Sequence, residues 1–164
     1  MSPLVHLVVM SLFALGQLEA ASTDFAIDLH VKLAKQTKKI AGGEITIGSR
    51  PKSRAVIEGM AGKDLTVSWS VRNSSKLTMF KDVTVHFFAV KIGKAGQQEV
   101  PRLDKNVPAE SALSMDFKPK DKSEGELTFA IEKPGTYLLR IETLGAAQGG
   151  KIQEYFAALD LVIK

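Results

Sequence analysis

The sequence predicts an all-β protein, a single antiparallel β-sandwich of seven or eight strands. Three observations support this prediction. Apolar and polar residues alternate with a period of two in several short segments, and turn-forming residues cluster between these segments. No segment shows the 3.6-residue apolar period of an amphipathic helix. Serial short strands of this kind favour a sandwich over alternating βαβ units.

The first predicted strand is 25–33, where five apolar residues share one face: Phe25, Ile27, Leu29, Val31 and Leu33. Residues 35–52 contain Gly-Gly and Arg-Pro breakers. They are interpreted as a loop with one possible short strand at 44–47. A further short strand is predicted at 54–60.

The strand at 65–72 holds the only tryptophan of the chain. Leu65, Val67, Trp69 and Val71 fall on one side, and smaller polar residues fall on the other. A tryptophan in the middle of an apolar phase is most simply explained as a residue that packs between two sheets. The alternative, an exposed ligand platform, would place it on a loop or on the polar phase.

The remaining predicted strands are 81–93, 111–117, 126–133, 136–144 and 154–164. The strand at 81–93 is apolar on both sides, because Phe88 and Val90 lie in the phase opposite Val85 and Phe87. We therefore expect it to be central and partly covered on both faces.

The N-terminus predicts export. Leu4–Leu15 is apolar except for His6 and Ser11, and small residues follow at 20–22. This run is too short to span a bilayer, which takes about 20 residues, but it suits the apolar region of a signal peptide. We expect a signal peptide at 1–21, cleavage near 20–22 and one domain at 22–164. The alternatives are a retained anchor and a buried N-terminal strand.

Composition restricts the possible functions. A hydrophobic content of 45% with 24% charged residues excludes a wholly disordered chain. The absence of cysteine excludes disulfides, thiolate catalysis and Cys-ligated metals. Removing residues 1–20 takes away Glu19 and no Lys or Arg, so the net charge rises from +4 to +5.

The excess of positive charge is concentrated in one segment. Six candidate residues for binding an anionic partner lie there: Lys35, Lys38, Lys39, Arg50, Lys52 and Arg54. Such a patch could attract a polyanion, an acidic glycan or an anionic lipid surface. The alternative is a solvated loop that keeps the protein soluble. No aromatic residues are interleaved with these bases, so specific nucleic-acid binding is not expected.

The order GKDLTVSWSVRNSS, KDVTVHFF and EGELTFAIEKPGTYLLRIE resembles bacterial immunoglobulin-like and fibronectin-type-III-like modules. It looks most like the CARDB-type domains of cell-surface and exported proteins. The matching features are the strand and turn at 62–73 and the Gly-x-Tyr at 135–137, and the resemblance covers about 60–164. It implies an immunoglobulin-like fold with an adhesive, spacer or ligand-presenting role, and it transfers no catalytic residue.

No catalytic site, metal site or cofactor is predicted. His30 and His86 are the only histidines past the signal segment and are the candidates for any metal ion, but no His-x-His or Met-rich cluster accompanies them. No Gly-x-Ser-x-Gly elbow and no phosphate-binding glycine loop is present. Asn73-Ser74-Ser75 matches the N-glycosylation sequon, although the same residues also favour a turn.

The sequence therefore predicts a secreted or periplasmic, non-catalytic interaction or structural module. Its partner is expected to be another protein or a component of the cell envelope, contacted through the basic segment at 35–54 or the loop at 94–108. The alternative function is a small periplasmic protein that binds a metal ion or an anionic ligand.

Overall fold

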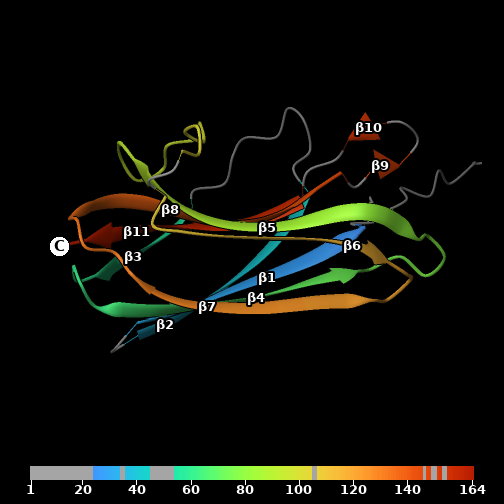
Figure 1. Ribbon diagram of the computed structural model, residues 1–164, viewed down its shortest axis with the longest axis horizontal. Coiled ribbons are helices and arrows are strands. Elements are labelled where there is room, and N and C mark those ends of the chain that lie inside the picture. The colour runs from blue at the N-terminus through green and yellow to red at the C-terminus, as the bar shows by residue number, and fades with distance from the viewer. Residues whose placement is uncertain are drawn as a thin grey trace, which may run out of the picture.

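The computed structural model describes residues 24–33, 36–44, 54–104, 107–145, 147–148, 151–152 and 155–164. These residues form a two-layer β-sandwich (Figure 1). Sheet A contains, in spatial order, β2 (Gln36–Glu44), β1 (Phe25–Leu33), β4 (Asp64–Asn73) and β7 (Lys122–Ala130). Sheet B contains β6 (Ala109–Phe117), β5 (Phe80–Ile92), β8 (Gly135–Leu144) and β11 (Tyr155–Ile163), with β3 (Ala55–Gly59) parallel to β11. The strands β9 (Ala147–Gln148) and β10 (Lys151–Ile152) form a separate small hairpin. The predicted all-β sandwich is confirmed.

The core lies between the two sheets and is built by the alternation seen in the sequence. Along β1 and β4, every second residue is buried. The inward phases of both sheets join in one apolar cluster with Val83, Val85 and Phe87 of β5 and Leu139 and Ile141 of β8. Two sheets packed through alternate side chains in this way define a β-sandwich. Within the described residues, no helix has the length and apolar character that crossing a membrane would require.

Strand β2 links the two sheets. Its residues 36–42 pair with β1, and then Gly43 and Glu44 pair with Phe156 and Tyr155 of β11. The interpretation of 35–52 as mainly loop was therefore wrong for 36–44. Main-chain pairing along β1 holds this segment in the sheet. It therefore forms a strand without the period-two alternation that a buried face would require.

Strand β7 begins earlier than the sequence predicts. Residues 118–125 read as a charged turn, yet the strand starts at Lys122. Ser123 pairs with Val71, and Gly125 pairs with Trp69, so the inward phase of the strand continues through two residues that are not apolar. Gly125 has to lack a side chain because a large ring from β4 fills the space above it.

That ring is the indole of Trp69. The Trp69 side chain is buried and stacks on Phe87 of the opposite sheet, with ring centroids 5.1 Å apart and an interplanar angle of 10°. The indole lies over Gly125, where an added Cβ would be 2.3 Å from Trp69 Cζ2. Trp69 therefore fills the core, as the sequence predicts.

Strand β8 opens with a tyrosine corner. The Tyr137 hydroxyl donates a hydrogen bond of 2.8 Å to the backbone carbonyl of Lys133, four residues upstream. Burial raises the pKa of the Tyr137 phenol above its usual 10.0, which keeps the donating proton in place. This contact recurs at the start of one strand in immunoglobulin-like sandwiches. Together with the strand order β1–β4–β7 facing β5–β8–β11, it identifies the sandwich as immunoglobulin-like.

Asn73 closes β4 with a fully buried side chain. Its Nδ2 donates to the carbonyls of Thr78 (2.8 Å), Phe117 (3.2 Å) and Lys118 (2.9 Å), and its Oδ1 accepts from Ser75 N (2.9 Å). The amide thus ties β4 to the end of β6. A glycan on Nδ2 would replace these contacts, so the sequon residues form a structural turn in the folded protein.

Replacing Asn73 with Asp tests this role. Asn73→Asp puts a carboxylate against three carbonyl oxygens in a buried site, and we expect it to lower the free energy of unfolding by about 3–5 kcal/mol. Urea unfolding followed by Trp69 fluorescence measures the change. Ser74→Ala, one residue further along, is the control and is expected to lose less than about 1 kcal/mol. Equal losses in the two variants would contradict the role assigned to the amide.

Gly125→Ala tests the packing of the indole. The added methyl group cannot fit without moving the ring, so we expect a loss of about 1–2 kcal/mol, after the smaller gain from a stiffer unfolded chain. In a Trp69→Phe background the same change should cost much less, because the smaller ring leaves room. A double-mutant cycle followed by circular dichroism measures the coupling. No coupling between the two positions would show that the ring does not lie over Gly125.

Candidate functional site

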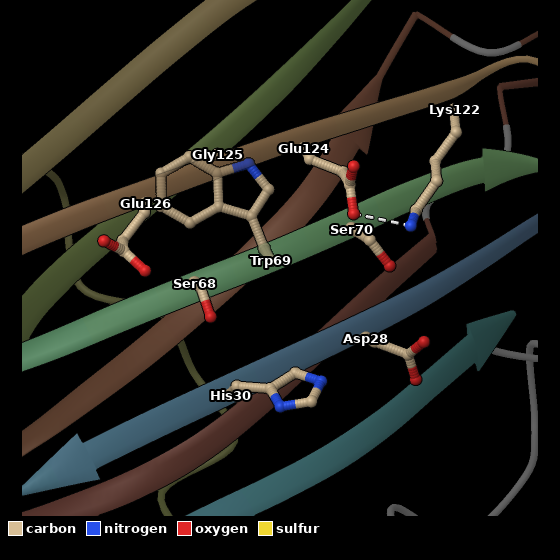
Figure 2. A pocket seen from close by; sticks show the side chains of 9 residues that line it. All are labelled: Asp28, His30, Ser68, Trp69, Ser70, Lys122, Glu124, Gly125 and Glu126. Atoms are coloured by element: carbon tan, nitrogen blue, oxygen red, sulfur yellow. Dashed lines mark ion pairs between the residues drawn. The ribbon is translucent and has the colours of Figure 1, made fainter.

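A shallow trough runs along the outer face of sheet A. It has a volume of about 540 Å³ and is lined by Asp28 and His30 of β1, by 68–70 of β4, and by Lys122 and 124–126 of β7 (Figure 2). The strand register explains its shape. His30, Ser68 and Glu126 lie side by side in one row across the sheet, and Asp28, Ser70 and Glu124 lie in the next. Because serine is short and its neighbours are long, the central strand β4 forms the floor.

Further polar residues lie at the two ends of the trough. At one end, the Thr66 and Thr128 hydroxyls share a hydrogen bond of 2.9 Å. At the other end, Arg72 lies opposite Lys122, and Lys122 Nζ forms an ion pair of 2.5 Å with Glu124 (Figure 2). The trough is therefore two rows long and about 10 Å wide, since β1 and β7 are two strand spacings apart.

Most polar side chains in the trough have no partner within the described chain. No hydrogen bond or ion pair joins five of them to a described residue: Asp28, His30, Ser68, Ser70 and Glu126. Four of the five are half-buried, Glu126 being the exposed one. Their hydrogen-bonding groups are thus available to water or to a ligand.

The outer face of sheet B is different, because the protein covers it itself. Val100, Leu103 and Val107, from the connection between β5 and β6, pack over Phe88 and neighbouring residues of β5, β8 and β11 in a second apolar cluster. This explains why β5 is apolar on both sides, as the sequence predicts. Much of the predicted 94–108 loop is therefore a structural cover.

Beside this cover, polar side chains of sheet B satisfy one another. His86 Nε2 lies 2.9 Å from Glu110 Oε1, and His86 Nδ1 lies 3.3 Å from Glu142 Oε1. Arg140 Nε forms an ion pair of 2.6 Å with Glu142 Oε2, and its guanidinium stacks on Phe156 at 4.0 Å. Carboxylates face both ring nitrogens of His86, so this network joins β5, β6 and β8 and leaves no imidazole nitrogen for a metal ion.

The structure does not bring His30 and His86 together. His30 lies in the trough on sheet A, and His86 lies on the outer face of sheet B, on the far side of the core. A single metal ion cannot contact both. Within the described residues, no group of three or more His, Asp or Glu side chains is arranged to hold a metal ion.

Of the six predicted basic residues, Arg54 is used inside the protein. Its Nε donates to Asp160 Oδ1 at 2.8 Å, and its Nη2 donates to the Gln97 carbonyl. The Asp160 carboxylate is fully buried and also accepts from Gly96 N at 2.6 Å. A buried carboxylate needs such a partner, so the charge of Arg54 is not available to a polyanion.

The other five basic residues are spread over two segments. Lys38 is exposed on β2, and Lys39 lies at the register position opposite His30. Lys35, Arg50 and Lys52 lie outside the described residues, as do residues 1–23 with the predicted signal peptide.

A second hollow of about 700 Å³ lies at one end of the sandwich. Its floor is apolar, with Val90, Ile131 and Tyr137, and its rim carries five charged residues: Lys91, Arg102, Asp104, Glu132 and Lys133. Lys91 extends over Gly135, where an added Cβ would be 2.9 Å from Lys91 Cε. The rim therefore has three cationic and two acidic residues around an apolar floor.

The sequence pattern places only part of the trough. It puts Ser68, Ser70 and His30 on outward phases, but the turn interpretation of 118–125 removed Glu124 from any strand. The alternation of Glu124, Glu126 and Thr128 with Ser123, Gly125 and Leu127 was the signal that could have extended β7.

Comparison with known structures finds similar folds at low sequence identity. The C-terminal domain of Wzt aligns over 87% of this chain and 74% of its own, with 10% identity and a TM-score of 0.47. The solution structure of a CARDB domain from Pyrococcus furiosus aligns over 84% and 94%, with 10% identity and a TM-score of 0.41. A crystal structure of that domain in complex with di-metal ions aligns over 85% and 94%, with 12% identity and a TM-score of 0.39.

No family model matches this sequence, and no curated protein sequence matches it. The identification of the architecture itself rests on the strand order and the tyrosine corner.

Proposed function

We propose that this protein is an exported, non-catalytic binding module that contacts a component of the cell envelope, or another protein there, through the trough on sheet A. The observation that supports this proposal is the trough itself, where four half-buried polar side chains have no partner among the described residues. On sheet B, by contrast, His86, Arg140 and Glu142 pair with one another or with neighbouring residues, and the apolar cluster around Phe88 is covered.

The proposal of export rests on the sequence of the first 21 residues. A mature chain starting near residue 22 would begin just before Asp24, whose carboxylate accepts a hydrogen bond of 3.2 Å from the Tyr155 hydroxyl.

A variant with a filled trough tests the proposed function. Ser68→Gln with Ser70→Gln raises the trough floor without changing the net charge. We expect it to reduce co-sedimentation of the mature protein with the envelope fraction of the source organism at least tenfold. The matched control is Thr84→Gln with Ser114→Gln, two hydroxyl residues paired on the outer face of sheet B. Undiminished co-sedimentation of the filled variant would refute the proposal.

The hollow at the end of the sandwich supports a second candidate function, the binding of a small anionic ligand with an apolar body. Three cations and two acids surround an apolar floor there, and an apolar floor with a few polar groups is the usual composition of a small-molecule site. The metal-binding alternative has no comparable support, because His30 and His86 lie on opposite faces.

Binding of the anionic dye 8-anilinonaphthalene-1-sulfonate tests the second candidate. Lys91→Met with Lys133→Met removes two rim cations and keeps the aliphatic parts of both side chains. We expect the affinity for the dye to fall at least threefold and to become less sensitive to salt. Lys76→Met with Lys81→Met, at exposed positions away from the hollow, is the control for net charge. The same affinity in both double variants would exclude the hollow as the site.

A further inference from the structure

We infer that the trough on sheet A binds a neutral, polyhydroxylated ligand, that is, a glycan chain without acidic groups. This inference rests on the proposed function and names the chemical class of the ligand. Three features of the trough point to it: its hydrogen-bonding groups, its charge balance and its shape.

The hydrogen-bonding groups require a ligand with several donors. Asp28 and Glu126 carry carboxylates, which only accept, and neither has a partner among the described residues. Ser68 and Ser70 supply hydroxyls that both donate and accept, and His30 supplies an imidazole that can do either. A ligand with hydroxyl groups at successive positions satisfies this mixture, and hydrogen bonds from a hydroxyl to a carboxylate are stronger than neutral ones.

The charge balance disfavours a strongly charged ligand. In the four paired rows from Thr66 to Arg72, the described outward residues include three acids, Asp28, Glu124 and Glu126. The same rows contain three bases, Lys32, Arg72 and Lys122. A polyanion would meet the acids in the middle of the trough, and a polycation would meet the bases at both ends. Across β1, β4 and β7 the acids and bases of these rows therefore balance, which disfavours a strongly charged ligand of either sign.

The shape of the trough suits an extended polar chain. Its floor consists of the serine side chains, the backbone at Gly125 and part of Trp69, whose indole stacks on Phe87 in the core. Trp69 is the one lining residue with a largely apolar side chain and is only 9% exposed, so an apolar ligand would gain little there. Contacts of this kind are individually weak. We therefore expect measurable binding when many copies of the protein meet a repeating polymer.

An array of immobilised oligosaccharides tests the inference. The probes are neutral glucans, mannans and galactans, with uronic-acid and sulfated glycans as charged arms, and poly-lysine as a cationic arm. The protein is presented as a multivalent streptavidin conjugate. We expect the wild type to bind at least one neutral glycan. We also expect Asp28→Asn with Glu126→Gln, which keep shape and remove charge, to weaken that binding at least tenfold.

Glu99→Gln, an exposed acid outside both hollows, is the control and is expected to bind like the wild type. Three results would overturn the inference: binding to charged probes only, binding to no probe, or full binding by the Asp28→Asn, Glu126→Gln variant. If the filled trough still abolishes co-sedimentation with the envelope, the proposed function stands and only the ligand class is wrong. If the variant with the filled trough still co-sediments with the envelope, both the proposed function and the inferred ligand class are wrong.

Discussion

The stack of Trp69 on Phe87 is the contact on which the rest of the structure depends. Trp69 belongs to an inner strand of sheet A and Phe87 to an inner strand of sheet B, so one pair of rings joins the two layers. An aromatic pair of this kind contributes more than the area it buries. The indole spans the distance because Gly125, beside it on β7, has no side chain. The register of β7 around Gly125 is thus set by the packing of the Trp69 indole in the core.

That register also determines the outer face of sheet A. Because Trp69 and Gly125 face inward, Ser68, Ser70, Glu124 and Glu126 must face outward. A slip of one residue in β7 would turn its acids into the core and destroy both the packing and the trough. The candidate site is therefore a direct consequence of the way the core is built, and the trough needs no loop to form it.

The two outer faces differ in whether their polar side chains bond to other parts of the protein. On sheet B, the side chains of His86, Arg140, Glu142 and Asp160 are buried, and each has an ion-pair or hydrogen-bond partner. Such networks hold strands and loops in place, because breaking one pair leaves a buried charge without compensation. On sheet A, Asp28, His30, Ser68 and Ser70 are half-buried and have no partner among the described residues. Function in a sandwich fold depends on such differences between faces rather than on the fold.

The sequence by itself determined the fold class, the inward phase of most strands, the buried position of Trp69 and the covered character of β5. These follow from side-chain alternation, a local property that the backbone geometry of a strand imposes on any half-buried sheet. The sequence could not determine strand β2, because this strand is held by pairing along β1 and has no alternation of apolar and polar residues. Only the tertiary structure decided that Arg54 is bound to Asp160, 106 residues away, and that Asn73 is a buried turn residue. Only the tertiary structure separated His30 from His86. Whether a polar side chain is used or left available depends on partners distant in sequence, and alternation carries no information about which strands become neighbours.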